Sequence, residues 1–121
     1  MMRHELLGER GILILHPDEV LRAEDFSALA EVVDPYILQH GGLKGLMIDA
    51  PSFPGWDSFA ALVSHLRFVR DHQQKIQRIA VVSDNKILSV APKIASQFLH
   101  AQLRTFEVAE RAAALTWLET G

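Results

Sequence analysis

Apolar residues are grouped along the chain in two ways, as short continuous runs and as longer stretches with helical spacing. Apolar runs of about four to eight residues between turn residues are typical of β-strands. We therefore predict five strands, at residues 5–7, 12–15, 43–49, 76–83 and 103–106. The first two flank a turn and form a predicted hairpin, whereas the third and fourth are apolar enough to be covered on both faces.

Two stretches between these runs carry apolar residues three and four positions apart, the spacing of one helix face. The first ends at Gly41 and Gly42 and contains Pro35, where we expect a kink or a break. Its predicted inner face consists of Phe26, Leu29, Ala30, Val33, Ile37 and His40. The second is predicted to run from Trp56 to His72. Its predicted core-facing stripe consists of Phe59, Leu62, Val63, Leu66 and Val69.

Two more helices are predicted in the second half of the chain. Residues 86–100 show helical spacing that Pro92 interrupts. The last helix places four apolar residues on one face: Val108, Ala112, Leu115 and Leu118. Strands that alternate with helices form a mostly parallel sheet with right-handed crossovers, and the first hairpin adds an antiparallel strand. The predicted fold is therefore α/β, with a mostly parallel five-stranded sheet and about four helices.

The composition is that of an ordinary folded protein, with 49% apolar and 22% charged residues among 121. This length suits a single domain covering residues 1–121. Lys and Arg number 12 against 15 Asp and Glu, a net charge of −3, so no basic excess exists to bind nucleic acid. The absence of cysteine excludes disulfides, thiolate zinc sites and thiol catalysis.

The start of the chain, "MMRHELLGERG", has charged residues where a signal peptide needs its apolar core. No apolar run reaches the length of about 18 residues that a membrane-spanning helix requires. We therefore expect a cytoplasmic protein, either free in solution or peripheral to a membrane.

Three stretches resemble the SpoIIAA-like family of small bacterial proteins. They are "GLMIDAPSFPGW", "IQRIAVVSDNK" and "LRTFEVAERAAALTWL", and their order and spacing extend the resemblance over nearly the whole chain. The resemblance implies a STAS-like domain, the fold of the anti-sigma-factor antagonists, which is also similar to the lipid-binding CRAL-TRIO fold. It further implies binding or regulation in place of catalysis.

The chain departs from the antagonists at two positions. In those proteins the strand that corresponds to "LMID" ends in Asp-Ser, and that serine takes the phosphate that switches partner binding. Here Ala50 follows Asp49, and nothing marks Ser52 or Ser58 as a replacement, so we do not expect this phosphate switch. Arg22 stands where related sequences have a Thr helix N-cap, an exchange that costs about 1 kcal/mol unless the cap shifts.

Polar residues follow three of the predicted strands, at His16, Asp49 and Asp84. Open α/β sheets bind ligands outside the carboxyl ends of their strands, so we expect these residues at one edge, beside Lys86 and the 50–56 loop. Either the carboxylates hold the polar head of a ligand, or they only orient their loops by accepting bonds from backbone amides. Two carboxylates and one histidine without close spacing do not predict a metal site, and no cofactor motif is present.

Phe53 and Trp56 lie in a short loop that contains two prolines. Two interpretations stay open. The rings either close the core at the edge of the sheet or project outward, where Phe59 and Leu88 would extend an apolar surface for lipid, membrane or a partner protein.

Phe68 lies opposite Phe59 at about 100° per residue, on a face that it shares with His65 and His72. We expect this face to point outward and to form a homodimer contact. The two histidines are two turns apart, about 10 Å along the helix, which is too far for the pair to chelate a metal ion.

The sequence does not predict an enzyme, because it contains neither GxSxG nor HExxH and its histidines are scattered. We predict a binding or regulatory module that contacts a small amphipathic or apolar ligand, or a membrane surface, through loops 50–56 and 84–88. The predicted contact residues are Asp49, Phe53, Trp56, Phe59, Asp84, Lys86 and Leu88. The alternative is a protein-interaction regulator that presents the helix starting near Trp56 to a partner.

Overall fold

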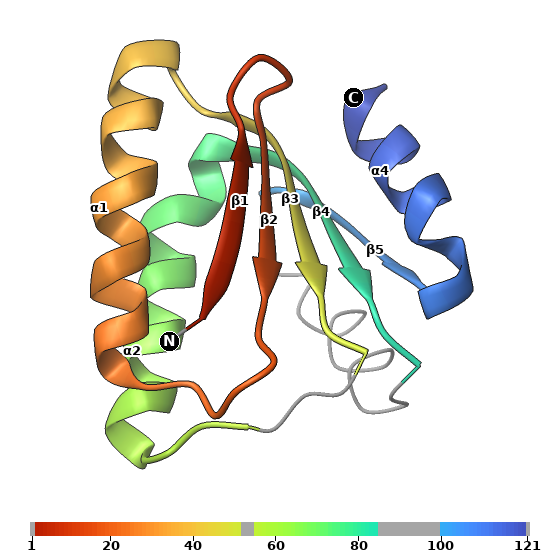
Figure 1. The fold of residues 1–121 in the computed structure, drawn as a ribbon. Helices are drawn as coiled ribbons and strands as arrows, with labels where there is room; N and C mark the ends of the chain where they lie inside the picture. The colour runs from red at the N-terminus through yellow and green to blue at the C-terminus, as the bar shows by residue number, and fades with distance from the viewer. Residues whose placement is uncertain (1, 52–54, 85–99, 121) are drawn as a thin grey trace.

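The computed structural model describes residues 2–51, 55–84 and 100–120, and it forms a five-stranded sheet with helices on both faces (Figure 1). The strands, in spatial order, are β1 (Arg3–Leu7), β2 (Ile12–His16), β3 (Leu43–Asp49), β4 (Ile76–Val82) and β5 (Gln102–Phe106). β1 pairs with β2 antiparallel, and all later pairs are parallel. The predicted α/β class and mixed sheet are therefore confirmed, with strand ends shifted by at most two residues.

The described residues contain three α-helices: α1 (Ala23–His40), α2 (Phe59–His72) and α4 (Arg111–Glu119). Short 3₁₀ helices at Gln73–Lys75 and Val108–Glu110 lead into β4 and α4. α1 and α2 lie on one side of the sheet and α4 on the other (Figure 1). The helix predicted at residues 86–100 falls, except for its last residue, on residues 85–99, which lie outside the described ranges.

The two central strands are buried on both faces, as their continuous apolar runs predict. Leu46 of β3 and Ile79 of β4 join the cluster under α1, whereas Met47 and Ala80, the next residue of each strand, join the cluster under α4. Successive strand residues point to opposite faces, so helices on both sides leave no polar face on these strands.

The start of α1 is stabilised by a side chain inside the helix. Arg22 is the N-cap residue, and its backbone N–H donates to Asp25 Oδ2 at 2.9 Å. This is half of a capping box, which offsets part of the loss of a Thr cap. The helix continues through Pro35, so of the predicted kink or break the break does not occur. Packing of Val33 in the core and the bond from Tyr36 Oη to the Gly8 carbonyl hold the helix on both sides of the proline.

α2 begins at Phe59, three residues later than predicted. Ser58 is its N-cap and accepts from the Ala61 N–H at 3.1 Å, so Trp56 lies in the segment before the helix. The predicted orientation of α2 is also wrong. Phe59 and Leu66 of the predicted core stripe are 80% and 61% exposed, while the opposite face, which carries Phe68, packs on α1.

β3 and α4 approach closely at a glycine. A Cβ on Gly45 would lie 2.9 Å from Leu118 Cβ, closer than carbon atoms pack without a shift of the chain. Leu118 is fully buried, so its side chain cannot move away into solvent. The absence of a side chain at position 45 therefore determines how near α4 lies to the sheet.

Gly45→Ala is expected to destabilise the protein by about 1–3 kcal/mol, because an added methyl overpacks a filled core. Gly8→Ala is the matched control, since its nearest neighbour would be a Tyr36 ring carbon at an ordinary 3.8 Å. Urea unfolding of both variants measures the difference. Equal unfolding midpoints would contradict the close-packing argument.

Candidate functional site

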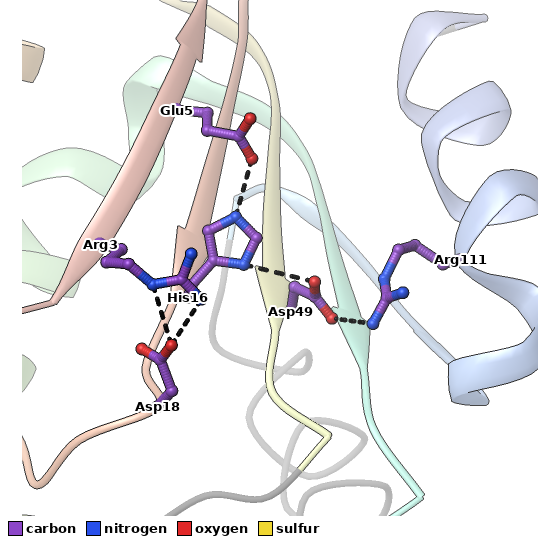
Figure 2. Close-up of polar contacts among 6 residues, drawn as sticks. All are labelled: Arg3, Glu5, His16, Asp18, Asp49 and Arg111. Atoms are coloured by element: carbon purple, nitrogen blue, oxygen red, sulfur yellow. Dashed lines mark hydrogen bonds and ion pairs between the residues drawn. The ribbon is translucent and has the colours of Figure 1, made fainter.

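Four ionisable side chains meet near the carboxyl ends of β2 and β3 (Figure 2). His16 Nε2 lies 2.8 Å from Glu5 Oε2, and His16 Nδ1 lies 3.4 Å from Asp49 Oδ2. Arg111 Nη2 donates to the other oxygen of Asp49, Oδ1, at 2.8 Å. These residues come from β1, β2, β3 and the first position of α4, so one connected network joins three strands to the helix on one face of the sheet.

Asp49 is the central member of this network. Its side chain is only 10% exposed, and each of its oxygens faces a cationic or proton-donating group. Both ring nitrogens of His16 face carboxylate oxygens, which accept and cannot donate, so a doubly protonated ring satisfies this geometry. Both oxygens of Asp49 are thus engaged within the chain, as expected for a carboxylate that orients its loop.

Glu5 and Arg111 were not predicted, although the sequence contains a signal for each. Arg111 opens a helix, where the helix dipole disfavours a positive charge unless an anion lies close, and Asp49 is that anion. Glu5 is the diagonal neighbour of His16 across the β1–β2 hairpin, since Glu5 pairs with Ile14 and Arg3 with His16. Glu5 could be assigned to the network only once the β1–β2 register was known. Arg111 could be assigned only once the position of α4 was known.

Arg3 forms a second ion pair beside the network. Its Nε and Nη2 both donate to Asp18 Oδ2, which ties the segment after β2 back to β1 (Figure 2). The hydrogen bond to Arg3 lowers the pKa of Asp18, and the same bond raises the pKa of Arg3. Both side chains are exposed to solvent, so this pair is a peripheral contact.

Asp84 has a different role from Asp49. Its Oδ1 accepts from the backbone N–H of Val108 at 3.0 Å and so fixes the turn that precedes α4. A catalytic arrangement of Ser83 and Asp84 with His16 gains no support, because His16 faces Glu5 and Asp49. Three predicted contact residues, Phe53, Lys86 and Leu88, lie outside the described residues. Within the described part of the chain, no group of three or more His, Asp or Glu side chains is placed to hold a metal ion.

The segment of Trp56 is fixed to the start of α1. The Leu21 N–H donates to the Gly55 carbonyl and the Asp57 N–H donates to the Leu21 carbonyl, both at 2.8 Å. Trp56 Nε1 donates to His65 Nδ1 at 3.1 Å, and the residue stays 38% exposed. Trp56 therefore folds against α2 with part of its surface in solvent, which combines the two predicted interpretations of this ring.

Aromatic and histidine rings fill the contact between α1 and α2. His65 stacks on Phe26 with ring centroids 4.9 Å apart, and Phe68 stacks on His72 at 4.0 Å. His72 Nε2 lies 2.6 Å from Asp34 Oδ1 on α1. The predicted outward position of this face is therefore wrong, and the argument for a homodimer contact at His65, Phe68 and His72 no longer holds.

The part of α2 that remains in solvent includes a group of apolar side chains beside Arg67, Arg70 and Asp71. We call Phe59, Leu62, Val63 and Leu66 the α2 stripe. Phe59 and Leu66 are exposed and the other two residues are half-buried, although the i, i+3, i+4, i+7 spacing is that of a helix face that packs on another surface. Large exposed apolar side chains that gather on one helix face mark an interaction site.

A shallow hollow of about 280 Å³ lies at the opposite edge of the sheet. Leu43 and Gln77, near the amino ends of β3 and β4, are among its lining residues, together with His40, Gly41, Gly42, Gln74 and Lys75. It is therefore remote from the carboxyl-end loops where ligand binding was predicted. None of the helices in the described ranges is long and apolar enough to cross a membrane.

Residues 12–119 match the SpoIIAA-like family. The chain is also similar to the crystal structure of an uncharacterised protein of the DUF3478 family with a SpoIIAA-like fold, from Shewanella loihica PV-4. The two chains are 19% identical with a TM-score of 0.77, and the alignment covers 98% of this chain and 92% of that one. At this identity the likeness shows the fold alone. No protein with a curated description matches the chain.

Asp49→Asn is expected to destabilise the protein by about 1.5–3 kcal/mol, since it removes the negative charge from a buried charge-assisted bond to Arg111. Asp18→Asn is the matched control and should leave the unfolding midpoint nearly unchanged, because its ion pair is exposed. Urea unfolding near neutral pH measures both. A loss at Asp18 as large as that at Asp49 would contradict the central role of Asp49.

Proposed function

The chain belongs to the SpoIIAA-like family, and we propose that it is a non-enzymatic regulatory module that binds a partner protein through the α2 stripe. The observation that carries this proposal is the orientation of α2. The helix turns its histidines toward α1 and leaves Phe59 and Leu66 in solvent. Apolar anchors at this spacing are typical of a helix that docks into an apolar groove of a partner.

The polar residues at the carboxyl ends of the strands support a non-enzymatic role. Asp49 bonds to Arg111, His16 bonds to Glu5 and lies within ion-pair distance of Asp49, and Asp84 bonds to backbone. A catalytic acid or base must lie within hydrogen-bond reach of the proton that it transfers, directly or through one water. These groups instead hold strands and helices together, so the site supports the fold more directly than it supports a reaction.

The charges around the α2 stripe favour a protein over a membrane. An amphipathic helix that binds anionic lipid is rich in Lys and Arg on its polar face. α2 has Arg67 and Arg70, but Arg70 pairs with Asp71 and Asp57 precedes the helix, and the whole chain carries a charge of −3. An apolar centre with a rim of both charge signs is the usual anatomy of a protein interface.

Regulation by phosphate at the end of β3 is not part of the proposal. Ala50 occupies the position where the antagonists carry their phosphorylatable serine, and it is buried with its N–H donating to the Val82 carbonyl. A binding cycle in this chain must therefore be controlled by another feature.

A second candidate function keeps the ligand predicted from the sequence. Trp56 has an apolar ring that is partly in solvent and a polar N–H that is already bonded, a combination that suits contact with an amphipathic molecule or a lipid surface. In this case Trp56 would be the main contact, with α2 contributing less. The two candidates differ in which residue is essential.

Leu66→Glu is expected to weaken binding of a protein partner by at least about tenfold, because it places a charge in the apolar centre of the interface. The matched control is Leu38→Glu, since Leu38 is a helical leucine that is 89% exposed and lies on α1. A photo-crosslinking residue at position 59 should capture one protein from a native lysate in the parent and in the Leu38→Glu variant. Capture should fail in the Leu66→Glu variant.

Purification of the captured protein then allows its affinity for all three chains to be measured by calorimetry. Equal affinities for the Leu66→Glu and Leu38→Glu variants would contradict the proposed surface. Sedimentation with lipid vesicles tests the second candidate. Vesicle binding that is lost in Trp56→Ala and kept in Leu66→Glu would replace a protein partner with a lipid surface.

A further inference from the structure

We propose that His65 and Trp56 form a pH-sensitive latch, in which protonation of His65 releases the Trp56 ring from the α1–α2 contact. The inference goes beyond the proposed function, because the latch is a property of the fold whether or not α2 binds a partner. It is carried by the hydrogen bond between the two rings and by the stack of His65 on Phe26.

The geometry fixes the protonation state that the closed latch requires. The indole N–H of Trp56 can only donate, so His65 Nδ1 must accept at 3.1 Å with its lone pair. The single ring proton of His65 is then on Nε2. A second proton on Nδ1 would set two donors against each other, and the bond that holds the Trp56 ring would be lost.

The surroundings of His65 also disfavour its charge. Its ring lies 4.9 Å from the Phe26 ring and 5.8 Å from the Trp56 ring, and burial lowers its pKa from the ordinary value of 6.5. The folded protein therefore binds this proton less readily than the unfolded chain does. The contribution of His65 to stability is complete above pH 6.5 and is lost as the pH falls from there through the lowered pKa.

The charged groups of the neighbouring elements are engaged elsewhere or lie beside the rings. On α1, Asp25 accepts from the backbone N–H groups of Met2 and Arg22. In the segment before α2, Asp57 is exposed next to Trp56. Neither charge contributes to the shift in the pKa of His65. Burial of the ring lowers that pKa.

His72, on the same helix face, lies against acceptors and not against a donor as His65 does. His72 faces two acceptors, Asp34 Oδ1 at 2.6 Å and the Phe68 carbonyl at 2.8 Å, which a doubly protonated ring satisfies. The contacts of His72 do not depend on an unprotonated ring nitrogen, whereas the Trp56–His65 bond does. The release is local, because it frees the Trp56 side chain while the backbone bonds of Gly55 and Asp57 to Leu21 stay in place.

The test follows Trp56 in the full chain with Trp117→Phe, which removes the other tryptophan. Acrylamide quenching of Trp56 should rise about twofold between about pH 8 and pH 5, since the ring starts from 38% exposure. The rise should share its midpoint with the titration of the His65 ring resonances in NMR spectra. His65→Asn supplies an acceptor oxygen near the position of Nδ1 without a titration, so it should keep quenching low throughout.

His40→Asn is the matched control, because His40 is an exposed helical histidine that stacks on Tyr36. It should behave like the parent. Unchanged Trp56 quenching while His65 titrates would overturn the latch, and so would a rise in His65→Asn equal to that of the parent. Should His65→Asn fail to fold by circular dichroism, the parent still decides. Its Trp56 indole N–H resonance must titrate together with His65 or the proposal is wrong.

Discussion

The contact between α1 and α2 is made by rings, and the orientation of α2 depends on it. Phe26 receives His65 on its face, Phe68 stacks on His72, and His72 reaches Asp34 across the helix pair. Stacking and hydrogen bonding both act along this contact, so α2 is rotated about its axis with Phe68 and the histidines toward α1. Burial of leucine alone would favour the opposite rotation, which places Leu66 toward α1. Every property of the outer face of α2 follows from the observed rotation, including the exposure of Phe59 and Leu66.

The opposite face of the molecule depends on a single carboxylate. Asp49, at the end of β3, accepts from Arg111 at the start of α4 and faces His16 of β2. A change at Asp49 therefore removes contacts between these three elements. Burial makes these bonds strong and makes an unpaired Asp49 costly. The carboxyl edge of the sheet, where open α/β folds bind ligands, is in this chain a place where strands and helix are joined.

The sequence predicted the sheet closely because its evidence is local. The runs at Leu43–Asp49 and Ile76–Val82 are apolar on both faces, and only strands between two layers need that pattern. The rotation of α2 was missed for a physical reason. Its sequence offers two faces, an aliphatic one and one with Phe68 and two histidines, and periodicity cannot show which one finds complementary rings on α1.

The candidate site was predicted in part. The topology rule placed His16 and Asp49 together correctly, since both follow parallel neighbouring strands. It could not supply Glu5 or Arg111, whose positions depend on the hairpin register and on the distance of α4 from the sheet. Asp84 follows a strand of the same sheet, but it does not join the network. Its Oδ1 accepts from the Val108 N–H, which the segment before α4 places 3.0 Å away.

The contact between Gly45 and Leu118 has an evolutionary consequence. These two positions are already in contact, so they cannot change in size independently. A larger residue at position 45 is tolerated only where the residue at position 118 is smaller. Positions 45 and 118 should thus covary in volume among relatives. The distance between α4 and the sheet is then set by the combined volume of residues 45 and 118, and not by either residue alone.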